Sequence, residues 1–219
     1  MRILGLDPSK RSMGWALWAP GDQPASGVWE LGSELTSRGT VFARVHERMM
    51  ELHQLGKIEA VFYEEALNIM PARPDANGGG GGSIVRTNKE SILLSTGIAA
   101  HIESFGEAMG FRIIRPVNQT SWRRHFLGPM KRGTKKVDLK AYAMERCRQL
   151  GFRPSKHDQA EAIGVLDYAC ASLNIIPPWS ASEVLRPALR DCQDFRVWPG
   201  IMGNKESHYV TTQRTCHTE

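Results

Sequence analysis

The 219-residue sequence has no long uncharged apolar run, and its four cysteines are far apart, with no C-x-x-C pair. The first absence excludes a transmembrane helix, which needs about 20 apolar residues, so no membrane partner is expected. The second leaves a zinc ribbon unsupported. The N-terminus reaches Asp7 before an apolar signal-peptide core could form, and Cys147 and Cys170 fall in helical patterns typical of buried thiols. We therefore expect a cytoplasmic protein.

Acidic residues are scarce between residues 112 and 140, where nine lysines and arginines accompany one acid, Asp138. The whole chain is also basic, with 28 Lys and Arg against 23 Asp and Glu. This distribution favours an anionic partner such as nucleic acid, although a solvated helix face can have the same composition. The apolar share of 41% is that of a globular protein and excludes a disordered chain.

Apolar segments separated by turns predict an α/β fold that begins with three strands, continues with alternating helices and strands, and ends with helices. Three short strands, at 2–7, 13–19 and 27–34, form an antiparallel meander. The other predicted elements are a helix at 40–55, a strand at 59–65, a helix at 88–110, a strand at 111–117, and helices at 119–127, 134–150 and 156–173.

Apolar spacing also predicts which face of each helix is buried. In the first helix the buried residues are Val41, Val45, Met49 and Leu52. In the second the apolar positions are Ile92, Leu93, Thr96, Ala99, Ala100 and Ile102. In the last they are Ile163, Leu166, Cys170 and Leu173.

Two segments lack this periodicity. Residues 68–87 contain five consecutive glycines, at 78–82, and predict a flexible loop. Residues 177–219 are rich in proline and predict a partly irregular tail, appended to one domain at 1–176.

Four acids stand where predicted elements begin or end. Asp7 ends the first strand, Glu64 ends the fourth, and Asp158 and Glu161 lie one turn apart at the start of the last helix. Neighbouring strands of an open sheet deliver such residues into one crevice. Carboxylates gathered there would repel each other without cations, and oxygen ligands suit Mg²⁺ or Mn²⁺. Two such ions could hold the attacking and leaving oxygens of a phosphodiester.

Each acid also has a purely structural interpretation. Strand alternation sends only one acid of the pair at 64–65 inward. The segment 155–158 has the S-x-x-D pattern of a helix cap, so Asp158 could serve only as a cap. Glu161 could be an exposed helix acid. His157 could be a metal ligand or a general base, but a lone histidine is more often neither.

Three segments that contain these acids, LGLDPSKRSMGWALW, FYEEALN and KHDQAEAIGVLDYAC, resemble in this order the acidic motifs of RuvC-type Holliday junction resolvases. Between them, RPVNQTSWRRHFLG and KRGTKKVDLKAY resemble the segment that holds the junction's phosphates. The match spans about residues 2–173. It implies a ribonuclease H-like fold, with a mixed central sheet of three antiparallel strands plus parallel strands, flanked by helices. It also implies a homodimer that cleaves branched DNA with two Mg²⁺ ions per active site, for which Mn²⁺ can substitute.

The resemblance carries catalytic and metal-binding roles over to Asp7, Glu64, Asp158 and Glu161. It assigns phosphate contact to Arg123 and to a lysine of the pair at 135–136. The full set expected to contact DNA is Lys10, Arg11, Leu67, Arg123, Arg124, Lys131, Arg132, Lys135, Lys136 and Lys140.

The sequence departs from the family's usual residues at three positions in or beside these motifs. Ser9 stands where the family usually has glycine, and Glu161 replaces the commoner aspartate. Leu67 occupies a position where bacterial enzymes often carry an aromatic wedge, and leucine cannot stack on a base.

Two other functions remain open. A ribonuclease H or a YqgF-like RNA-processing nuclease also begins with a strand and a GLD motif. Ribonuclease H needs a third acid on its fourth strand, whereas here the last two acids share one late helix, which favours the resolvase type. A catalytically silent protein that binds branched DNA would keep the fold, although the intact acids argue against it.

Overall fold

The computed structural model describes residues 1–9, 11–66, 89–131 and 133–181. Within these ranges, five strands form one mixed sheet in the order β3-β2-β1-β4-β5. The antiparallel strands are β1 (Ile3–Pro8), β2 (Ser12–Trp18) and β3 (Ala25–Glu30). Parallel to β1 lie β4 (Ala60–Glu64) and β5 (Ile113–Val117). The predicted meander and mixed sheet are confirmed. β2 begins and ends one residue earlier than predicted, and β3 begins two residues and ends four residues earlier.

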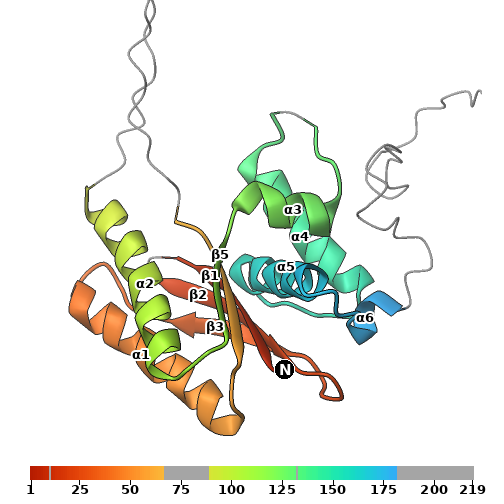
Figure 1. The fold of residues 1–219 in the computed structure, drawn as a ribbon. Helices are drawn as coiled ribbons and strands as arrows, with labels where there is room; N and C mark the ends of the chain where they lie inside the picture. Colours follow the sequence, from red (N-terminus) through yellow and green to blue (C-terminus); the bar gives the residue numbers. More distant parts are fainter. Residues whose placement is uncertain (10, 67–88, 132, 182–219) are drawn as a thin grey trace, which may run out of the picture.

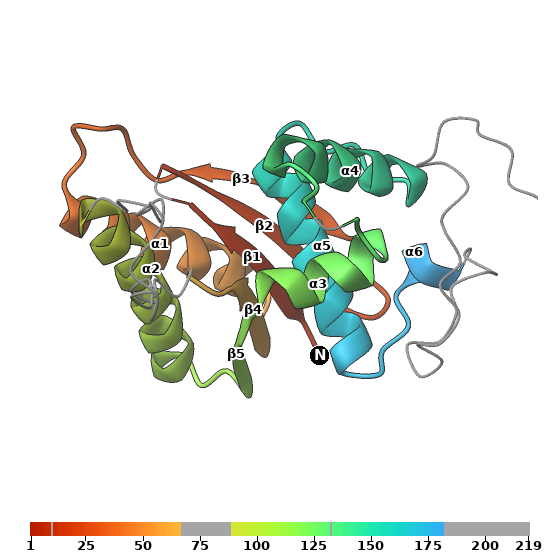
Figure 2. The same ribbon diagram turned by 90° about the horizontal axis from the view of Figure 1, so that it is seen from above.

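Helices cover both faces of the sheet (Figures 1 and 2). One face carries α1 (Arg38–Leu55) and α2 (Lys89–Ala108). The other face carries α3 (Gln119–Leu127), α4 (Lys136–Gln149), α5 (His157–Ser172) and α6 (Pro178–Ala181). Helix α5 packs directly on β1 and β2, and α3 and α4 pack against α5.

Side-chain caps fix where two of these helices begin. The Ser37 side chain accepts a hydrogen bond from the Thr40 backbone N–H at the start of α1. The Asn118 side chain accepts one from the Thr120 N–H at the start of α3. Each bond satisfies a backbone donor that the helix itself leaves without a partner.

The sheet separates two apolar cores, and alternate residues of β1 serve both. Ile3 packs with α3, α4 and α5, whereas Leu4 and Leu6 pack with α1 and α2. All three residues are inaccessible to solvent. A strand covered on both faces needs apolar residues at successive positions, which explains the nearly unbroken apolar run of β1.

Two glycines allow α5 to lie close to the sheet. A Cβ atom at Gly5 would lie 2.7 Å from the Leu166 backbone nitrogen, and one at Gly14 would lie 1.8 Å from the Asp158 carbonyl oxygen. Any larger residue would therefore displace the helix. Because Gly14 is the register partner of Asp7, this close approach holds the first turn of α5 beside the end of β1.

Of the predicted apolar positions of α2, Ile102 is buried and Ala99 packs against the core, but the rest of the buried face differs from the prediction. Its buried apolar residues are Leu94, Ile98, Ile102 and Phe105, and Leu93 is 41% exposed. These four follow the 4, 4, 3 spacing of one helix face, whereas the predicted set mixed small residues from the neighbouring face. The predicted buried face of α1 is confirmed.

Residues that follow α5 pack back on the same side of the sheet. Trp179 in α6 is buried edge-on against Trp18 and Phe152, and its Nε1 donates a hydrogen bond to Asp167 at 2.9 Å. The predicted Gly-rich loop and residues 182–219 of the predicted tail lie outside the described residues.

Cys147 and Cys170 are free and buried, as predicted. Burial raises the pKa of each thiol to about 12, so both stay protonated at neutral pH. Of the helices that the structure describes, none has the length and apolar character that a bilayer crossing requires.

Candidate metal centre

Three of the four predicted acids meet where β1 ends and α5 begins. Asp7 is 6% exposed near the end of β1, and Asp158 and Glu161 lie in the first turns of α5. One ligand oxygen from each of the three lies within 4.8 Å of the others. A group of three carboxylates is suited to a hard divalent cation such as Mg²⁺ or Mn²⁺.

The fourth acid, Glu64, lies beside this group but is held by α3. Its Oε1 accepts a hydrogen bond from Gln119 Nε2 at 2.6 Å, and its Oε2 accepts one from Trp122 Nε1 at 2.7 Å. Both oxygens therefore already have a donor that fixes the orientation of the carboxylate. Burial raises the pKa of Glu64, against the opposing effects of the Trp122 hydrogen bond and of Arg123.

The pKa of Asp7 shows whether the acidic group would favour a bound cation. Burial raises the pKa of Asp7 well above its ordinary value, and the negative charges of Glu161, Glu64 and Asp158 raise it further. Lys140 opposes the shift without cancelling it. The ionised form of Asp7 is thus unfavourable in the protein alone, and a bound cation would relieve the repulsion.

Two basic side chains reach the acids. The Arg123 guanidinium donates through Nη2 to Glu161 Oε1, and its carbon lies 5.1 Å from the centre of the Trp122 ring. Only 10% of the Arg123 side chain is exposed. Lys140 Nζ lies 3.7 Å from Asp158 Oδ1 and 3.9 Å from Glu161 Oε2 at the more open side.

Arg123 also has a buried donor that no other group satisfies. Among the described residues, its Nε is the buried side-chain polar atom that lacks a hydrogen-bond partner. A buried N–H without an acceptor is unfavourable.

Asp158 does not cap α5. The cap residue is Lys156, which makes no side-chain capping bond. Instead, Gln159 Oε1 accepts hydrogen bonds from the Ser155 backbone N–H at 2.8 Å and from its hydroxyl at 3.1 Å. The Asp158 carboxylate points to β2, where Ser12 Oγ donates to its Oδ2.

No protein-family model matches the sequence, and no curated protein is significantly similar to it. The fold is similar to that of Thermus thermophilus RuvC in complex with a Holliday junction substrate. The TM-score is 0.53 at 15% identity, and the alignment covers 84% of this chain and 97% of that chain. This is the RuvC-type fold.

A second Thermus thermophilus RuvC structure gives a TM-score of 0.52 at 15% identity, covering 80% of this chain and 97% of that chain. The yeast mitochondrial Holliday junction resolvase Ydc2 aligns more weakly, with a TM-score of 0.45 at 8% identity, over 76% of this chain and 77% of that chain. The RuvC comparisons confirm the predicted fold.

Seven of the ten residues expected to contact DNA are described by the structure, and they fall into three groups. Arg123 lies inside the acidic group and Lys140 at its edge. Arg11 is exposed and pairs with Glu34. Four others are exposed on α3, on the connection into α4 and at the first residue of α4: Arg124, Lys131, Lys135 and Lys136. Lys10, Leu67 and Arg132 lie outside the described residues.

Sequence reasoning missed three polar residues that hold the acids: Ser12, Gln119 and Trp122. The signal for two of them was present, because Gln119 and Trp122 stand three apart and therefore share one face of α3. Ser12 had no sequence signal. Ser9, where the family usually has glycine, donates its hydroxyl to the Ser12 carbonyl oxygen at 2.5 Å and so supports the turn that positions Ser12.

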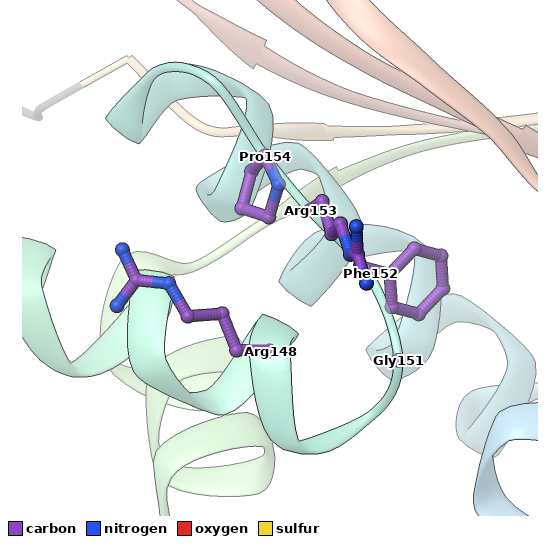
Figure 3. A pocket seen from close by; sticks show the side chains of 5 residues that line it. All are labelled: Arg148, Gly151, Phe152, Arg153 and Pro154. Atoms are coloured by element: carbon purple, nitrogen blue, oxygen red, sulfur yellow. The ribbon is translucent and has the colours of Figure 1, made fainter.

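A hollow of about 540 Å³ lies at the end of α4 and in the loop that leads to α5 (Figure 3). Its lining residues are Arg148, Gly151, Phe152, Arg153 and Pro154. None of the four acids lines it, so it is separate from the candidate metal centre.

Proposed function

We propose that this protein is a divalent-metal-dependent endonuclease that cleaves branched DNA, with Holliday junctions as the first candidate substrate. The observation that carries the proposal is the group formed by Asp7, Asp158 and Glu161, with Glu64 beside it, in a RuvC-type fold. One of the RuvC structures with this fold contains a Holliday junction substrate.

The four acids would divide the work of binding Mg²⁺ or Mn²⁺. Asp7, Asp158 and Glu161 would hold the metal, and Glu64, whose carboxylate α3 orients, would complete the set of ligands. Bound ions would supply Lewis-acid activation of the attacking water and stabilise the leaving oxygen. Gln119, Trp122 and Ser12 would keep Glu64 and Asp158 oriented during the reaction.

The exposed basic residues between α3 and the start of α4 would contact the DNA backbone. Arg124, Lys131, Lys135 and Lys136 share this region, and Lys140 extends it to the acids. Contacts to phosphates carry no sequence information and weaken steeply with salt. A homodimer would present two such sites about a two-fold axis, as two symmetric cuts require.

Labelled four-way, Y-shaped and linear duplex DNA, each with Mg²⁺, Mn²⁺ or a chelator, would test this function. We expect metal-dependent cuts near the branch and none in linear duplex. Paired symmetric cuts would establish a resolvase. Binding without cleavage in either metal would favour the silent DNA-binding protein, and cleavage confined to an RNA–DNA hybrid would favour a ribonuclease H.

A further inference from the structure

The hollow at the end of α4 has the chemistry of an anion-binding site. Two of its five lining residues are arginines and none is an acid. Figure 3 shows that Arg148 comes from α4 and Arg153 from the loop that follows it. The planar fork of an arginine side chain binds phosphate through two parallel N–H bonds. At about 540 Å³, the hollow is also large enough for one nucleotide unit.

Both arginines are accessible to a ligand. The Arg148 side chain is 57% exposed, and its pair with Glu145 joins two exposed side chains of one helix, which contributes little to stability. Arg148 also lies in the last turn of α4, where a positive charge complements the helix dipole. Arg153 is exposed outside the helix, and among the described residues no acid forms an ion pair with it. The helix dipole therefore explains the charge of Arg148 alone.

The backbone around the hollow is fixed without a ligand. Gly151 has a φ of 88°, in the left-handed region, and the Phe152 backbone N–H donates to the Cys147 carbonyl oxygen at 2.9 Å. This turn closes the end of α4. The Phe152 ring packs edge-on against Trp179, with the ring centres 5.4 Å apart. A site that is already formed loses less conformational entropy when it binds.

The hollow lies near the candidate metal centre along the chain. Arg153 precedes Asp158 by five positions, and an extended chain spans at most about 3.6 Å per residue, so their Cα atoms lie within about 18 Å of each other. Residues of one DNA strand follow each other about every 3.4 Å along the helix axis, so this distance is about five nucleotides. The connecting residues, 155–157, are exposed and include Lys156.

We propose that the hollow is a second DNA-backbone site, which holds the cut strand within about five nucleotides of the cleaved bond. Arg148 and Arg153 contact the phosphates, and Phe152 and Pro154 contact the adjoining sugar. The short distance to the acids favours a DNA strand over an acidic protein as the ligand. The inference rests on the proposed function, because it adds a contact to that same substrate.

Binding of labelled four-way DNA in chelator, measured at several salt concentrations, tests this contact. Arg148→Gln and Arg153→Gln each remove one phosphate contact, so the slope of log K against log salt should become shallower by about 1 in each and by about 2 in the double variant. At physiological salt the double variant should bind about thirtyfold more weakly. The double Arg→Lys variant keeps both charges and should keep the wild-type slope.

Arg48→Gln is the matched control for Arg148→Gln. Arg48 is also an exposed helical arginine that pairs with a glutamate three positions away, Glu51, but it lies in α1 on the opposite face of the sheet. Its slope and affinity should equal those of wild type. Thermal unfolding checks that each variant is folded.

Neutral linkages in the DNA would locate the contact. Methylphosphonates, which lack the phosphate charge, are placed one at a time at the five positions on each side of the mapped cut. In wild type, one or two of these positions should weaken binding. The same positions should have no effect in the double Arg→Gln variant, because its contact is already lost.

Wild-type slopes in both single Arg→Gln variants, with cleavage intact, would overturn the backbone site and leave the proposed function standing. Saturable binding of deoxyadenosine 5′-monophosphate that the double Arg→Gln variant loses, with unchanged binding of four-way DNA, would make the hollow a site for free nucleotides and also overturn the inference. A wild-type protein that neither binds nor cleaves branched DNA would overturn both.

Discussion

The two faces of the sheet are built on different chemistry. On the α1 and α2 side, each buried residue of the two helices is apolar or glycine. On the opposite side, six polar or charged residues are buried: Asp7, Arg123, Arg146, Gln159, Glu161 and Asp167. The buried side chains of α1 and α2 therefore contribute apolar burial alone. The opposite face has an apolar core as well, and beside it lies a group of acids around Asp7 that repel each other until a cation compensates them.

The difference follows from a single strand. Asp7 and Ile3 lie on the α5 side of β1, and Leu4 and Leu6 lie on the other. Because side chains alternate along a strand, a shift of one residue in register would exchange the two faces. Changes on each side should therefore affect different properties, and four experiments would test this separation.

The largest effect is expected for Asp7→Asn, which removes the acid central to the group. Cleavage of branched DNA should fall by about a thousandfold or more, because the metal ligands are incomplete. The metal-free protein should be no less stable than wild type, since the substitution removes a buried charge repelled by three others. Cleavage assays and thermal unfolding in chelator check both, and wild-type cleavage by this variant would rule out the mechanism.

On the apolar face, Ile98→Ala should lower stability and leave metal binding and cleavage unchanged. Ile98 is inaccessible to solvent in α2, so its truncation should lower the free energy of unfolding by about 2–5 kcal/mol. Mn²⁺ affinity and the cleavage rate per folded molecule should stay at wild-type values. Urea unfolding combined with the cleavage assay would measure this, and a selective loss of metal binding would show that the two faces are coupled.

Gly14→Ala should affect both properties. Its Cβ would lie 1.8 Å from the Asp158 carbonyl oxygen, so the first turn of α5 must move away from β1. We expect a loss of about 1–3 kcal/mol in the free energy of unfolding, together with weaker Mn²⁺ binding.

Gly39→Ala is the control for this substitution, because a Cβ at Gly39 meets no atom closer than 4.0 Å. It should stabilise α1 slightly, by about 0.5–1 kcal/mol. Equal Mn²⁺ affinity in Gly14→Ala and wild type would show that the close packing of α5 does not position the acids.

The smallest effect is a pH dependence of the metal-free protein. Because the pKa of Asp7 is raised in the folded state, the folded protein binds a proton that the unfolded chain has already lost. This contribution to stability is fully present below the ordinary pKa of 3.8 and is lost as the pH rises through the raised value. In chelator, the free energy of unfolding of wild type should therefore fall relative to that of Asp7→Asn as the pH rises toward neutral. A difference independent of pH would contradict the raised pKa.

Periodicity and turn residues predicted the elements well, because each depends on local sequence. The positions of the acids near element ends were also predictable, since the residues where a strand ends or a helix begins depend on local sequence. The side chains that hold the acids could not be predicted from the sequence. Arg123 belongs by sequence to a basic segment, yet it is buried because it follows Trp122 on the inner face of α3. Which face of a short helix points inward depends on long-range packing.

The error in α2 has a similar cause. Thr96, Ala99 and Leu93 fit an apolar face when spacing alone is considered, but the sheet receives the larger Leu94 and Ile98. The capping pattern that ends at Asp158 was also ambiguous from the sequence. In the structure Asp158 accepts its hydrogen bond from Ser12, which lies 146 residues away in the chain, and Gln159 takes the bond from the Ser155 backbone N–H.

Trp122 connects two acids of the candidate metal centre, Glu64 and Glu161, through one indole ring. Its N–H donates to Glu64, and its face carries the guanidinium that holds Glu161. The emission of an indole responds to nearby charge, so this residue is a natural optical probe of the site. A fluorinated tryptophan at this position would report, in one ¹⁹F resonance, when a cation displaces the charges around it.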